Sequence, residues 1–287
     1  MIYFTFKNFD NKNINFYNFL RDYFSFNKDY LLTPVTFTGV SGSFPYSYHN
    51  GNLNNNYGKG VIYKDLIQYQ EFSTYPFRFD CSNIYLTEED FDDTFLNLYL
   101  KIFEIGSNYI EISNLDFLEY LKNKYPNYKY ILSNNANFLT PFTPEILNKF
   151  TELDIFDLIQ LNFSQAKNIN FLKLLKNKNK YELPIGQLCN NCPKSANCLK
   201  LEQQTQYNFS DNFTRINCSL RTGLNKDTNI LSLETIKKQY LPLGFNHFIL
   251  PDFIQSFKDD IYIFIANYFI KQEYQANFFK DLEVLRV

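Results

Sequence analysis

The chain has 287 residues, of which 45% are hydrophobic and 20% charged, and its formal net charge is −2. This length allows one large domain or two small ones, with enough residues to bury a substantial core. The near-neutral charge gives no support for a nucleic-acid partner.

The chain also lacks the sequence features of export or membrane insertion. Its N-terminal stretch, MIYFTFKNFDNKNINF, has no basic segment followed by an apolar run and a small-residue cleavage site. The most apolar stretch, residues 261–270, is about half as long as a membrane span and predicts a buried helix instead. We therefore expect a soluble, cytoplasmic protein without a membrane partner. In a reducing compartment, clustered cysteines favour metal binding or catalysis over disulfides.

Short strand-like runs alternate with amphipathic helical ones along most of the chain. The strands predicted from β-branched and aromatic runs are 31–40, 76–83, 108–113, 128–134, 156–162, 180–186 and 245–250. The helices predicted from apolar periodicity and start and stop signals are 87–106, 115–125, one that opens at Pro144, 168–178, 233–241 and 256–271.

The helix predicted after the second strand has the clearest signals. Thr87 and Asp90 resemble a capping box with Asp in place of Glu, and Gly106 ends the run. Four apolar residues fall on one helical face and predict its buried side: Phe91, Phe95, Leu98 and Ile102.

Strand–helix alternation with short connections predicts a parallel α/β fold. Seven or eight strands in about 250 residues favour a (β/α)8-like barrel, complete or incomplete, with a doubly wound open sheet as the alternative. No strand is followed by a GxGxxG or GxxxxGK[ST] motif, which counts against nucleotide-binding versions. We expect a single domain over residues 1–287 that includes a cysteine-rich, metal-binding segment at 186–225.

In such folds the ligand site lies at the C-terminal ends of the strands. Polar residues and cysteines at the predicted strand ends are Thr38, Asp80, Cys81, Asn83, Ser113, Asn114, Ser133, Asn134, Asn162, Cys189 and Asp252. Our candidates for catalytic residues come from this edge and from the glycine-containing loop 39–51: Asp80, Asn83, Asn114, Asn162 and His49. We expect Cys81 to be a small core residue, with a thiol facing the site as the alternative.

The chain has two histidines, and neither lies in a recognisable catalytic motif. His49 is in a polar loop, residues 39–60, that either wraps a ligand with backbone N–H groups or is a surface excursion. His247 lies within a predicted strand, where a hydrogen-bonded core or barrel-interior residue is expected rather than a catalytic base. No GxSxG or HExxH motif occurs. The strand-end carboxylates Asp80 and Asp252 leave open a metal-independent enzyme that processes glycans.

Four of the five cysteines have the spacing C-x2-C-x5-C-x19-C: Cys189, Cys192, Cys198 and Cys218. Two thiolates separated by two residues can turn back onto one metal, and two further thiolates complete four-fold ligation. Structural zinc sites usually have two C-x2-4-C pairs, and the second pair is missing here. The spacing therefore favours a [4Fe–4S] cluster, with structural zinc as the first alternative and free thiols, including a partial disulfide, as the second.

The run CNNCPKSANC resembles the ligand run of the auxiliary-cluster domains of radical S-adenosylmethionine enzymes. The barrel-like body before it resembles the barrel of those enzymes or that of the collagenase-like peptidase family, whose members include iron–sulfur hydroxylation proteins. No C-x3-C-x2-C motif occurs, so the cluster that cleaves S-adenosylmethionine is not expected. The resemblance thus implies one cluster on the four cysteines in an enzyme or enzyme subunit. A zinc-stabilised, non-catalytic binding protein is the alternative.

Overall fold

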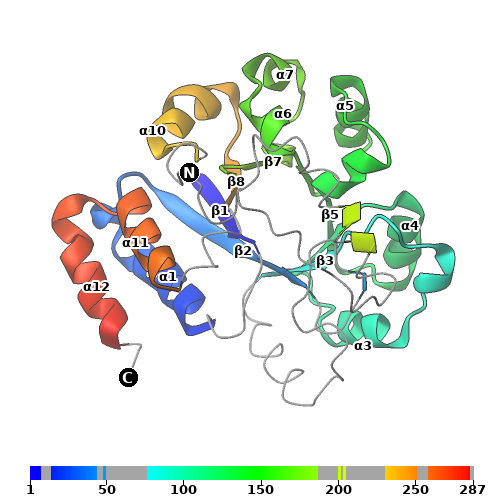
Figure 1. The fold of residues 1–287 in the computed structure, drawn as a ribbon, viewed down its shortest axis with the longest axis horizontal. Helices are drawn as coiled ribbons and strands as arrows, with labels where there is room; N and C mark the ends of the chain where they lie inside the picture. Colours follow the sequence, from blue (N-terminus) through cyan, green and yellow to red (C-terminus); the bar gives the residue numbers. More distant parts are fainter. Residues whose placement is uncertain are drawn as a thin grey trace.

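The computed structural model describes residues 1–7, 14–43, 48–49, 76–186, 200–201, 203–204, 230–250 and 258–284. Within these residues, eight parallel strands form a closed barrel in chain order, with β1 next to β8 (Figure 1). The strands are β1 (Ile2–Phe6), β2 (Val35–Ser43), β3 (Phe77–Cys81), β4 (Tyr109–Ile112), β5 (Lys129–Leu132), β6 (Leu158–Gln160), β7 (Tyr181–Pro184) and β8 (His247–Leu250). The predicted (β/α)8-like barrel is therefore confirmed, and the open sheet is excluded.

Helices surround the barrel (Figure 1). The α-helices are α1 (Ile14–Phe26), α3 (Thr94–Ile102), α4 (Leu115–Lys124), α5 (Pro144–Glu152), α6 (Phe163–Lys167), α7 (Ile169–Leu174), α10 (Leu233–Thr235), α11 (Lys258–Phe269) and α12 (Gln275–Glu283). Short 3-10 segments are η2 (Lys28–Tyr30), η4 (Glu88–Asp90), η5 (Asn134–Phe138), η6 (Lys178–Lys180), η9 (Leu241–Leu243) and η11 (Gln272–Tyr274), and η8 (Ile236–Tyr240) is a π-helix.

Strand β1 and helices α1 and α12 were not predicted from the sequence. β1 has the sequence IYFTF, pairs with β2 on one side and with β8 on the other, and thereby closes the barrel. All five of its residues are β-branched or aromatic, which favours a strand. The propensity was therefore present, but the strand stands at the start of the chain, before the alternation from which the others were recognised.

The predicted helix 87–106 was wrong in its start and in its buried face. The capping box of Thr87 and Asp90 is present, but it caps the 3-10 segment η4, and α3 begins separately after the N-cap Asp93. In α3 the buried residues are Leu96, Tyr99 and Leu100. Of the predicted stripe, Phe95, Leu98 and Ile102 are exposed. Only Phe91, which precedes the helix, is buried. The late start rotates the helix, so the neighbouring apolar stripe meets the barrel.

Two other predicted helices are each divided into shorter pieces. The segment 168–178 is α7 followed by η6, and α6 precedes it because an Asn162–Gln165 capping box starts a helix earlier. Asn168 ends α6 and its side chain caps α7. The segment 233–241 consists of α10, the π-helix η8 and the start of η9.

Strand β2 extends beyond the predicted end at residue 40, to Ser43, so the expected loop begins later than residue 39. Its pairing with β1 shifts at a bulge, where Phe4 pairs with Phe37 and Thr5 pairs with Gly39. Gly39 has φ +156°, and a Cβ atom there would lie 2.7 Å from the carbonyl oxygen of Pro76. The glycine is thus explained by close backbone packing within the sheet rather than by a loop.

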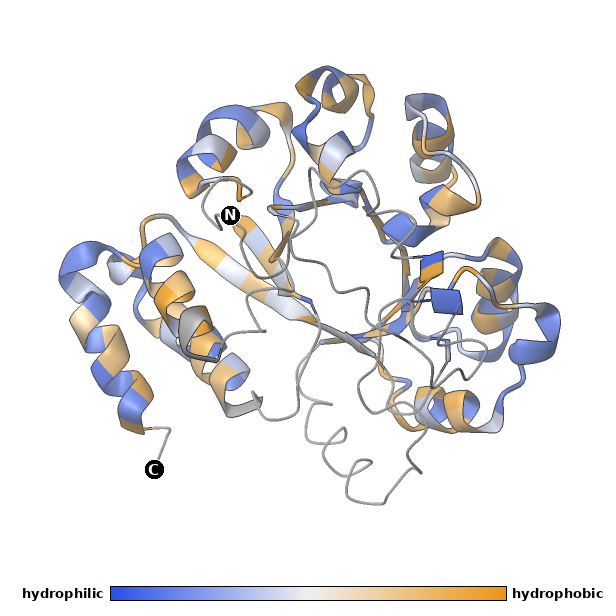
Figure 2. Ribbon diagram, in the orientation of Figure 1, coloured by the Kyte–Doolittle hydropathy of each residue, from blue (hydrophilic) through white to orange (hydrophobic). Residues whose placement is uncertain are grey.

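The hydrophobic core lies between the strands and the helices. Phe4 of β1 contacts Phe248 of β8 and Phe269 of α11, with ring centroids 5.7 and 4.9 Å apart. Hydrophobic residues mark one side of many helices and hydrophilic residues the other (Figure 2). The apolar segment 261–270 is largely the buried helix α11, as predicted. No helix in the described part of the chain is long and apolar enough to cross a membrane.

Candidate functional site

The strands present apolar side chains to the helices, and several of them present polar or charged side chains to the barrel interior. Apolar side chains share the interior, since Ile131 is in register with Glu111 and Ile249 with Thr5. On β3, Phe79 contacts Phe103 and Tyr128 in the outer layer, with ring centroids 5.7 and 6.1 Å apart. Successive strand residues point to opposite faces, so Arg78 and Asp80 point inward. The barrel interior therefore carries charged groups where most barrels carry branched aliphatic side chains.

A buried ion pair crosses the barrel. Arg78 of β3 donates from Nη1 to both carboxylate oxygens of Glu182 on β7, each at 2.7 Å, and both side chains are 1% exposed. Thr5 donates to Oε1 of Glu182 at 3.0 Å, and Gln160 donates to Oε2 at 3.3 Å. Burial alone would lower the pKa of Arg78, but the charges of Glu182 and Glu111 outweigh it and raise that pKa, so the guanidinium stays charged.

Glu111 of β4 is the second buried carboxyl group of the interior. It is 1% exposed, and neither of its carboxylate oxygens has a hydrogen-bond partner among the described residues. Burial raises the pKa of Glu111 to about 7, and the charge of Asp80 adds to the rise while that of Lys7 opposes it. A carboxyl group that titrates near neutrality and has no partner is typical of functional sites rather than of packed cores.

Asp80 lies beside Glu111, because the two residues are in register on adjacent strands. Its Oδ1 accepts hydrogen bonds from the backbone N–H and the hydroxyl group of Ser82, at 3.1 and 2.5 Å. Asn135 in turn donates to the Ser82 hydroxyl at 3.1 Å. These bonds form a buried polar network at the C-terminal end of β3, the edge where the sequence predicted the site.

His247 lies nearer the opposite end of the barrel, at the first position of β8. Its ring stacks on that of Tyr3 with centroids 4.8 Å apart, and its Nδ1 has no hydrogen-bond partner among the described residues. Burial lowers the pKa of His247, and Arg78 adds to this while Glu182 opposes it. The predicted barrel-interior position is confirmed, but one ring nitrogen lacks the hydrogen bond that was expected of a core histidine.

Two of the predicted catalytic candidates are helix caps in the structure. The side chain of Asn114 accepts from the backbone N–H groups of Asp116 and Phe117 at the start of α4, at 2.8 and 3.2 Å. Asn162 accepts from the N–H of Gln165 at 2.9 Å and caps α6. Their roles in catalysis stay predictions, and their observed contacts are structural.

The remaining two candidates, Asn83 and His49, contact each other through a buried backbone hydrogen bond. The amide of Asn83 donates to the carbonyl oxygens of Tyr48 and Gln203, at 2.8 and 3.1 Å. The backbone N–H of Asn83 donates to the carbonyl oxygen of His49 at 3.0 Å. His49 is buried, its Nε2 donates to the carbonyl oxygen of Asp90 at 2.9 Å, and burial lowers its pKa. Asn83 and His49 thus connect the segment after β3 with Tyr48–His49 and with Gln203.

Cys189, Cys192, Cys198 and Cys218 lie outside the described residues, as does Asp252. The structure does describe where the segment that contains the four cysteines leaves and rejoins the barrel. Gly186, just after β7, pairs with Ile230, and the N–H of Leu231 donates to the carbonyl oxygen of Ile185 at 2.6 Å. Between these ends, Gln203 accepts from Asn83 and from the N–H of Ile84 at 3.0 Å.

The fifth cysteine, Cys81, is part of the hydrophobic core, as predicted. It is 1% exposed and belongs to the same cluster as Phe77 and Phe79. Burial raises its pKa well above the ordinary thiol value, and Asp80 adds to the rise. The group is therefore a protonated thiol at neutral pH.

The residues that matter most in the interior were not among the sequence candidates: Arg78, Glu111 and Glu182. Each is a charged residue within a predicted strand, at residues 76–83, 108–113 and 180–186, with apolar residues on both sides. Because strand side chains alternate, a charge flanked by apolar residues points away from the apolar face. In a barrel covered by helices, that direction is the interior. This signal was available in the sequence.

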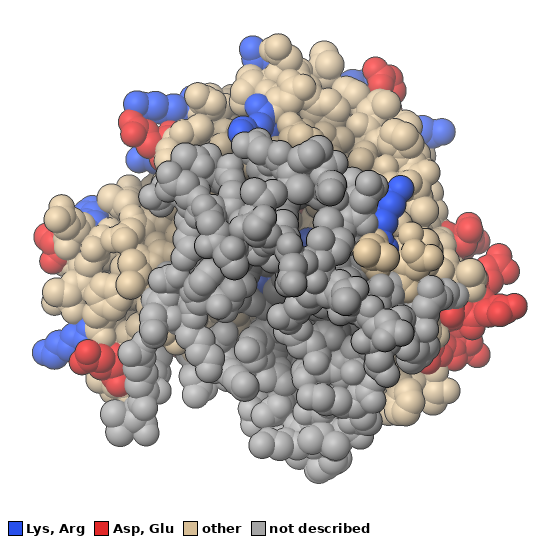
Figure 3. Space-filling model, in the orientation of Figure 1, with Lys and Arg blue, Asp and Glu red and all other residues tan. Residues whose placement is uncertain are grey.

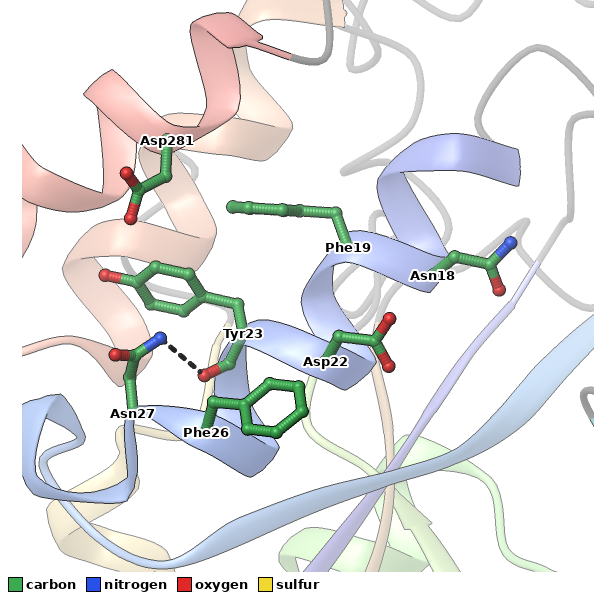
Figure 4. Close-up of a pocket in the computed structure, with 7 residues that line it drawn as sticks. All are labelled: Asn18, Phe19, Asp22, Tyr23, Phe26, Asn27 and Asp281. Atoms are coloured by element: carbon green, nitrogen blue, oxygen red, sulfur yellow. Dashed lines mark hydrogen bonds between the residues drawn. The ribbon is translucent and has the colours of Figure 1, made fainter.

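Two further features lie on the outer surface. Acidic side chains gather over η4 and the neighbouring helices on one flank (Figure 3). A groove of about 470 Å³ lies between α1 and α12, where Phe19 and Tyr23 approach Asp281 (Figure 4). Burial and the charge of Asp281 raise the pKa of Tyr23 to about 12, so its hydroxyl group stays protonated.

No protein-family model matches the sequence, and no curated protein matches it significantly. Among solved structures, that of the U32 peptidase Mk0906 is similar, with a TM-score of 0.55, 11% sequence identity, and coverage of 88% of this chain and 92% of the other. At that identity the likeness shows the fold alone. It supports the expected peptidase-type barrel as an architecture and provides no support for radical S-adenosylmethionine chemistry or an iron–sulfur cluster.

Proposed function

We propose that this protein is an enzyme, or the subunit of one, whose active site is the polar interior and C-terminal mouth of the barrel. We further propose that Cys189, Cys192, Cys198 and Cys218 bind a [4Fe–4S] cluster there. The observation that carries the enzymatic part is Glu111, a buried carboxyl group without a hydrogen-bond partner among the described residues.

The cost of such an interior supports a functional role. Leaving a buried carboxylate without a compensating partner costs several kcal/mol, and even a well-made buried ion pair such as Arg78–Glu182 is often no more stabilising than apolar residues of the same size. A barrel kept only for its stability has no need of these groups. The likeness of the fold to that of a peptidase is consistent with an enzyme.

The path of the chain supports a metal centre near this site. All four cysteines belong to residues 187–229, and this segment is closed at its base by the pairing of Gly186 with Ile230. The base lies at the C-terminal end of β7. Gln203, five residues after Cys198, is bound to the loop that follows β3, and β3 is separated from β7 by three strands on one side and by three on the other. The cysteine segment therefore has contacts on two opposite sides of the mouth.

The chemistry of the thiols is compatible with this ligand set. A thiol must lose its proton to bind a metal. Cys81 is buried in the core with a raised pKa, so it is not suited to this role. That leaves the other four cysteines, the number that a [4Fe–4S] cluster or a structural zinc ion requires. When bound by all four cysteines, a cluster would supply electron transfer or would shape the site.

The test is the metal content of the full chain purified without oxygen. We expect brown protein with broad visible absorbance and about four irons and four sulfides per chain. Colourless protein with about one zinc per chain would contradict the cluster and would leave the zinc-stabilised alternative. Protein free of both metals after anaerobic purification would contradict the ligand set itself.

Two cysteine variants sharpen this test. Cys198→Ser should lose the metal, because it removes one of the four proposed ligands. Cys81→Ala is the matched control: it should keep the metal content of the wild type although it removes a core side chain. Metal loss in Cys81→Ala at a temperature where that variant is folded would show that the ligands are wrongly assigned.

A further inference from the structure

We infer that the barrel interior binds a primary ammonium group of the substrate, with the Glu111 carboxylate as its counter-ion and Gln160 as a further acceptor. This inference rests on the proposed function in one respect, namely that the substrate enters the interior of the barrel. It adds the chemical class of the group that is recognised there.

Among the described residues, unpartnered buried acceptors outnumber unpartnered donors in this interior. Both carboxylate oxygens of Glu111 and the amide oxygen of Gln160 lack a hydrogen-bond partner among the described residues, and both side chains are 1% exposed. On the donor side, Nε of Arg78 is unpartnered, and Nδ1 of His247 can donate or accept. Unpartnered buried polar atoms are few in native proteins, and several in one place indicate a group that fills the site.

The two buried glutamates differ in how far they are satisfied. Glu182 accepts two hydrogen bonds from Arg78 and one each from Thr5 and Gln160. Glu111 accepts none from the described residues, whereas Nη1 of Arg78 donates to both carboxylate oxygens of Glu182. The position left open is therefore that of a cation with several N–H groups.

The charges of the interior favour a cation over water. Among the described residues, Asp80, Glu111 and Glu182 contribute three carboxyl groups, whereas the cations that act on Glu111 are Lys7 and Arg78. A third positive charge balances the ionised set. A primary ammonium also offers three donors, enough to pair with both carboxylate oxygens of Glu111 and with one further acceptor. A metal ion is a weaker fit, because no three His, Cys, Asp or Glu side chains in the described part of the chain are grouped to hold one.

Ligand binding should be coupled to the protonation of Glu111. Without a ligand this carboxyl group has a pKa of about 7, because it is buried and lies beside Asp80, with Lys7 opposing the rise. An ammonium group needs the ionised form. Binding below pH 7 must therefore release a proton, and the apparent affinity should rise by about tenfold per pH unit until it levels off above pH 7.

The experiment is isothermal titration calorimetry of the anaerobically purified full chain with butylammonium, in amine-free buffers that differ in ionisation enthalpy. At about pH 6 we expect release of close to one proton per ligand, and at about pH 8 almost none. Butanol and tetramethylammonium should bind at least about tenfold more weakly, since the first lacks the charge and the second lacks N–H donors. Equal binding of either control would overturn the inference.

A second pair of ligands distinguishes a free amine from a lysine side chain in a polypeptide. Acetyl-lysine amide, blocked at its α-amino group, presents the same ammonium on a peptide backbone. Tighter binding of this ligand than of butylammonium identifies a lysine-containing peptide as the source, and the reverse identifies a free amine. Binding of neither, in protein with wild-type melting behaviour, would contradict the inference.

Variants of Glu111 test the assignment to this residue. Glu111→Gln should weaken butylammonium binding by about 10- to 100-fold at pH 8 and abolish the proton release, since it removes a charge-assisted interaction. Glu111→Asp keeps a titrating carboxyl group and should retain proton release with weaker binding, which keeps the test available if Glu111→Gln folds poorly. Glu119→Gln, an exposed carboxylate on α4, is the matched control and should bind as the wild type does. Wild-type binding by Glu111→Gln would contradict the assignment.

The outcome is separable from that of the proposed metal centre. Glu111→Gln should leave the iron content unchanged, and Cys198→Ser should lose iron. Amine binding by protein without iron would support the inference and contradict the cluster. Iron-loaded protein that does not bind amines would support the cluster and contradict the inference.

Discussion

The two faces of the same barrel strands differ in almost every physical respect. On β3 the outward side chains, Phe77, Phe79 and Cys81, belong to the hydrophobic core, whereas the inward Arg78 and Asp80 are charged and buried. Both faces are excluded from water, but the outer one gains from apolar burial and the inner one loses hydration energy. The difference indicates that the outer layer supplies the stability of the fold and that the interior is maintained for another purpose.

The largest expected effect on stability comes from replacing Arg78, the cation of the inner face. Arg78→Met should lower the free energy of unfolding by about 3–5 kcal/mol, because it leaves Glu182 buried without its counter-ion. Chemical denaturation of the variant and the wild type measures the difference. The double variant Arg78→Met/Glu182→Leu should be more stable than the single one, because it removes the uncompensated charge. A loss below about 1 kcal/mol in the single variant would show that the interior is more hydrated than its burial indicates.

The outer face is tested by two neighbouring residues of α3. Leu96→Ala should lower the free energy of unfolding by about 2–5 kcal/mol, because it removes a side chain that is 1% exposed. Phe95→Ala is the matched control, since Phe95 is 57% exposed and should lose less than about 1 kcal/mol. The reverse order, measured by denaturation, would restore the helical face that the sequence predicted.

A smaller effect depends on pH. The pKa of Glu111 is raised in the folded state from 4.5 to about 7 by burial and by Asp80, while Lys7 and Arg78 oppose the rise and Glu182 adds to it. The folded protein therefore binds this proton more tightly than the unfolded chain does, and its stability falls as the pH rises between these two values.

Glu111→Gln removes this loss. Relative to the wild type, the variant should gain stability from about pH 4.5 to about pH 7 and then remain level, by an amount on the order of 3 kcal/mol. Denaturation curves across this range measure the difference. A difference that is independent of pH would show that Glu111 does not titrate there.

The smallest expected effect on stability concerns Asn114, which caps α4 and does not belong to the charged interior. Asn114→Ala should cost about 1 kcal/mol of stability through the loss of the cap on α4. Asn114→Asp, which keeps an acceptor at the N-cap, should cost less than half as much. Thermal unfolding is sufficient to measure both. Equal losses would indicate that the amide has a role besides capping.

The fold was more predictable from the sequence than the site. Alternating strands and helices predicted the barrel, since each unit has its own local signals. The helix over 115–125 was recognised by Pro126 at its end, and the following one by Pro144 at its first position. The face of α3 could not be decided, because two apolar stripes compete and only the packing against the barrel selects one of them.

The site candidates were chosen by a rule that also selects helix caps. When the connection between a strand and its helix is short, the polar residue after the strand is the N-cap of that helix, as Asn114 and Asn162 are. Charges inside the strands were the better signal for the interior. Their partners could not be predicted, because the contact of Arg78 with Glu182 joins residues 104 positions apart in the chain.

The pairing of Gly186 with Ile230 brings the two ends of the cysteine segment together between β7 and β8. A segment whose two ends are paired can change in length or sequence without a change in the register of any strand. Each doubling of its length costs the fold only about 0.6 kcal/mol in loop entropy. Such an attachment allows this segment to diverge between related proteins while the barrel stays the same.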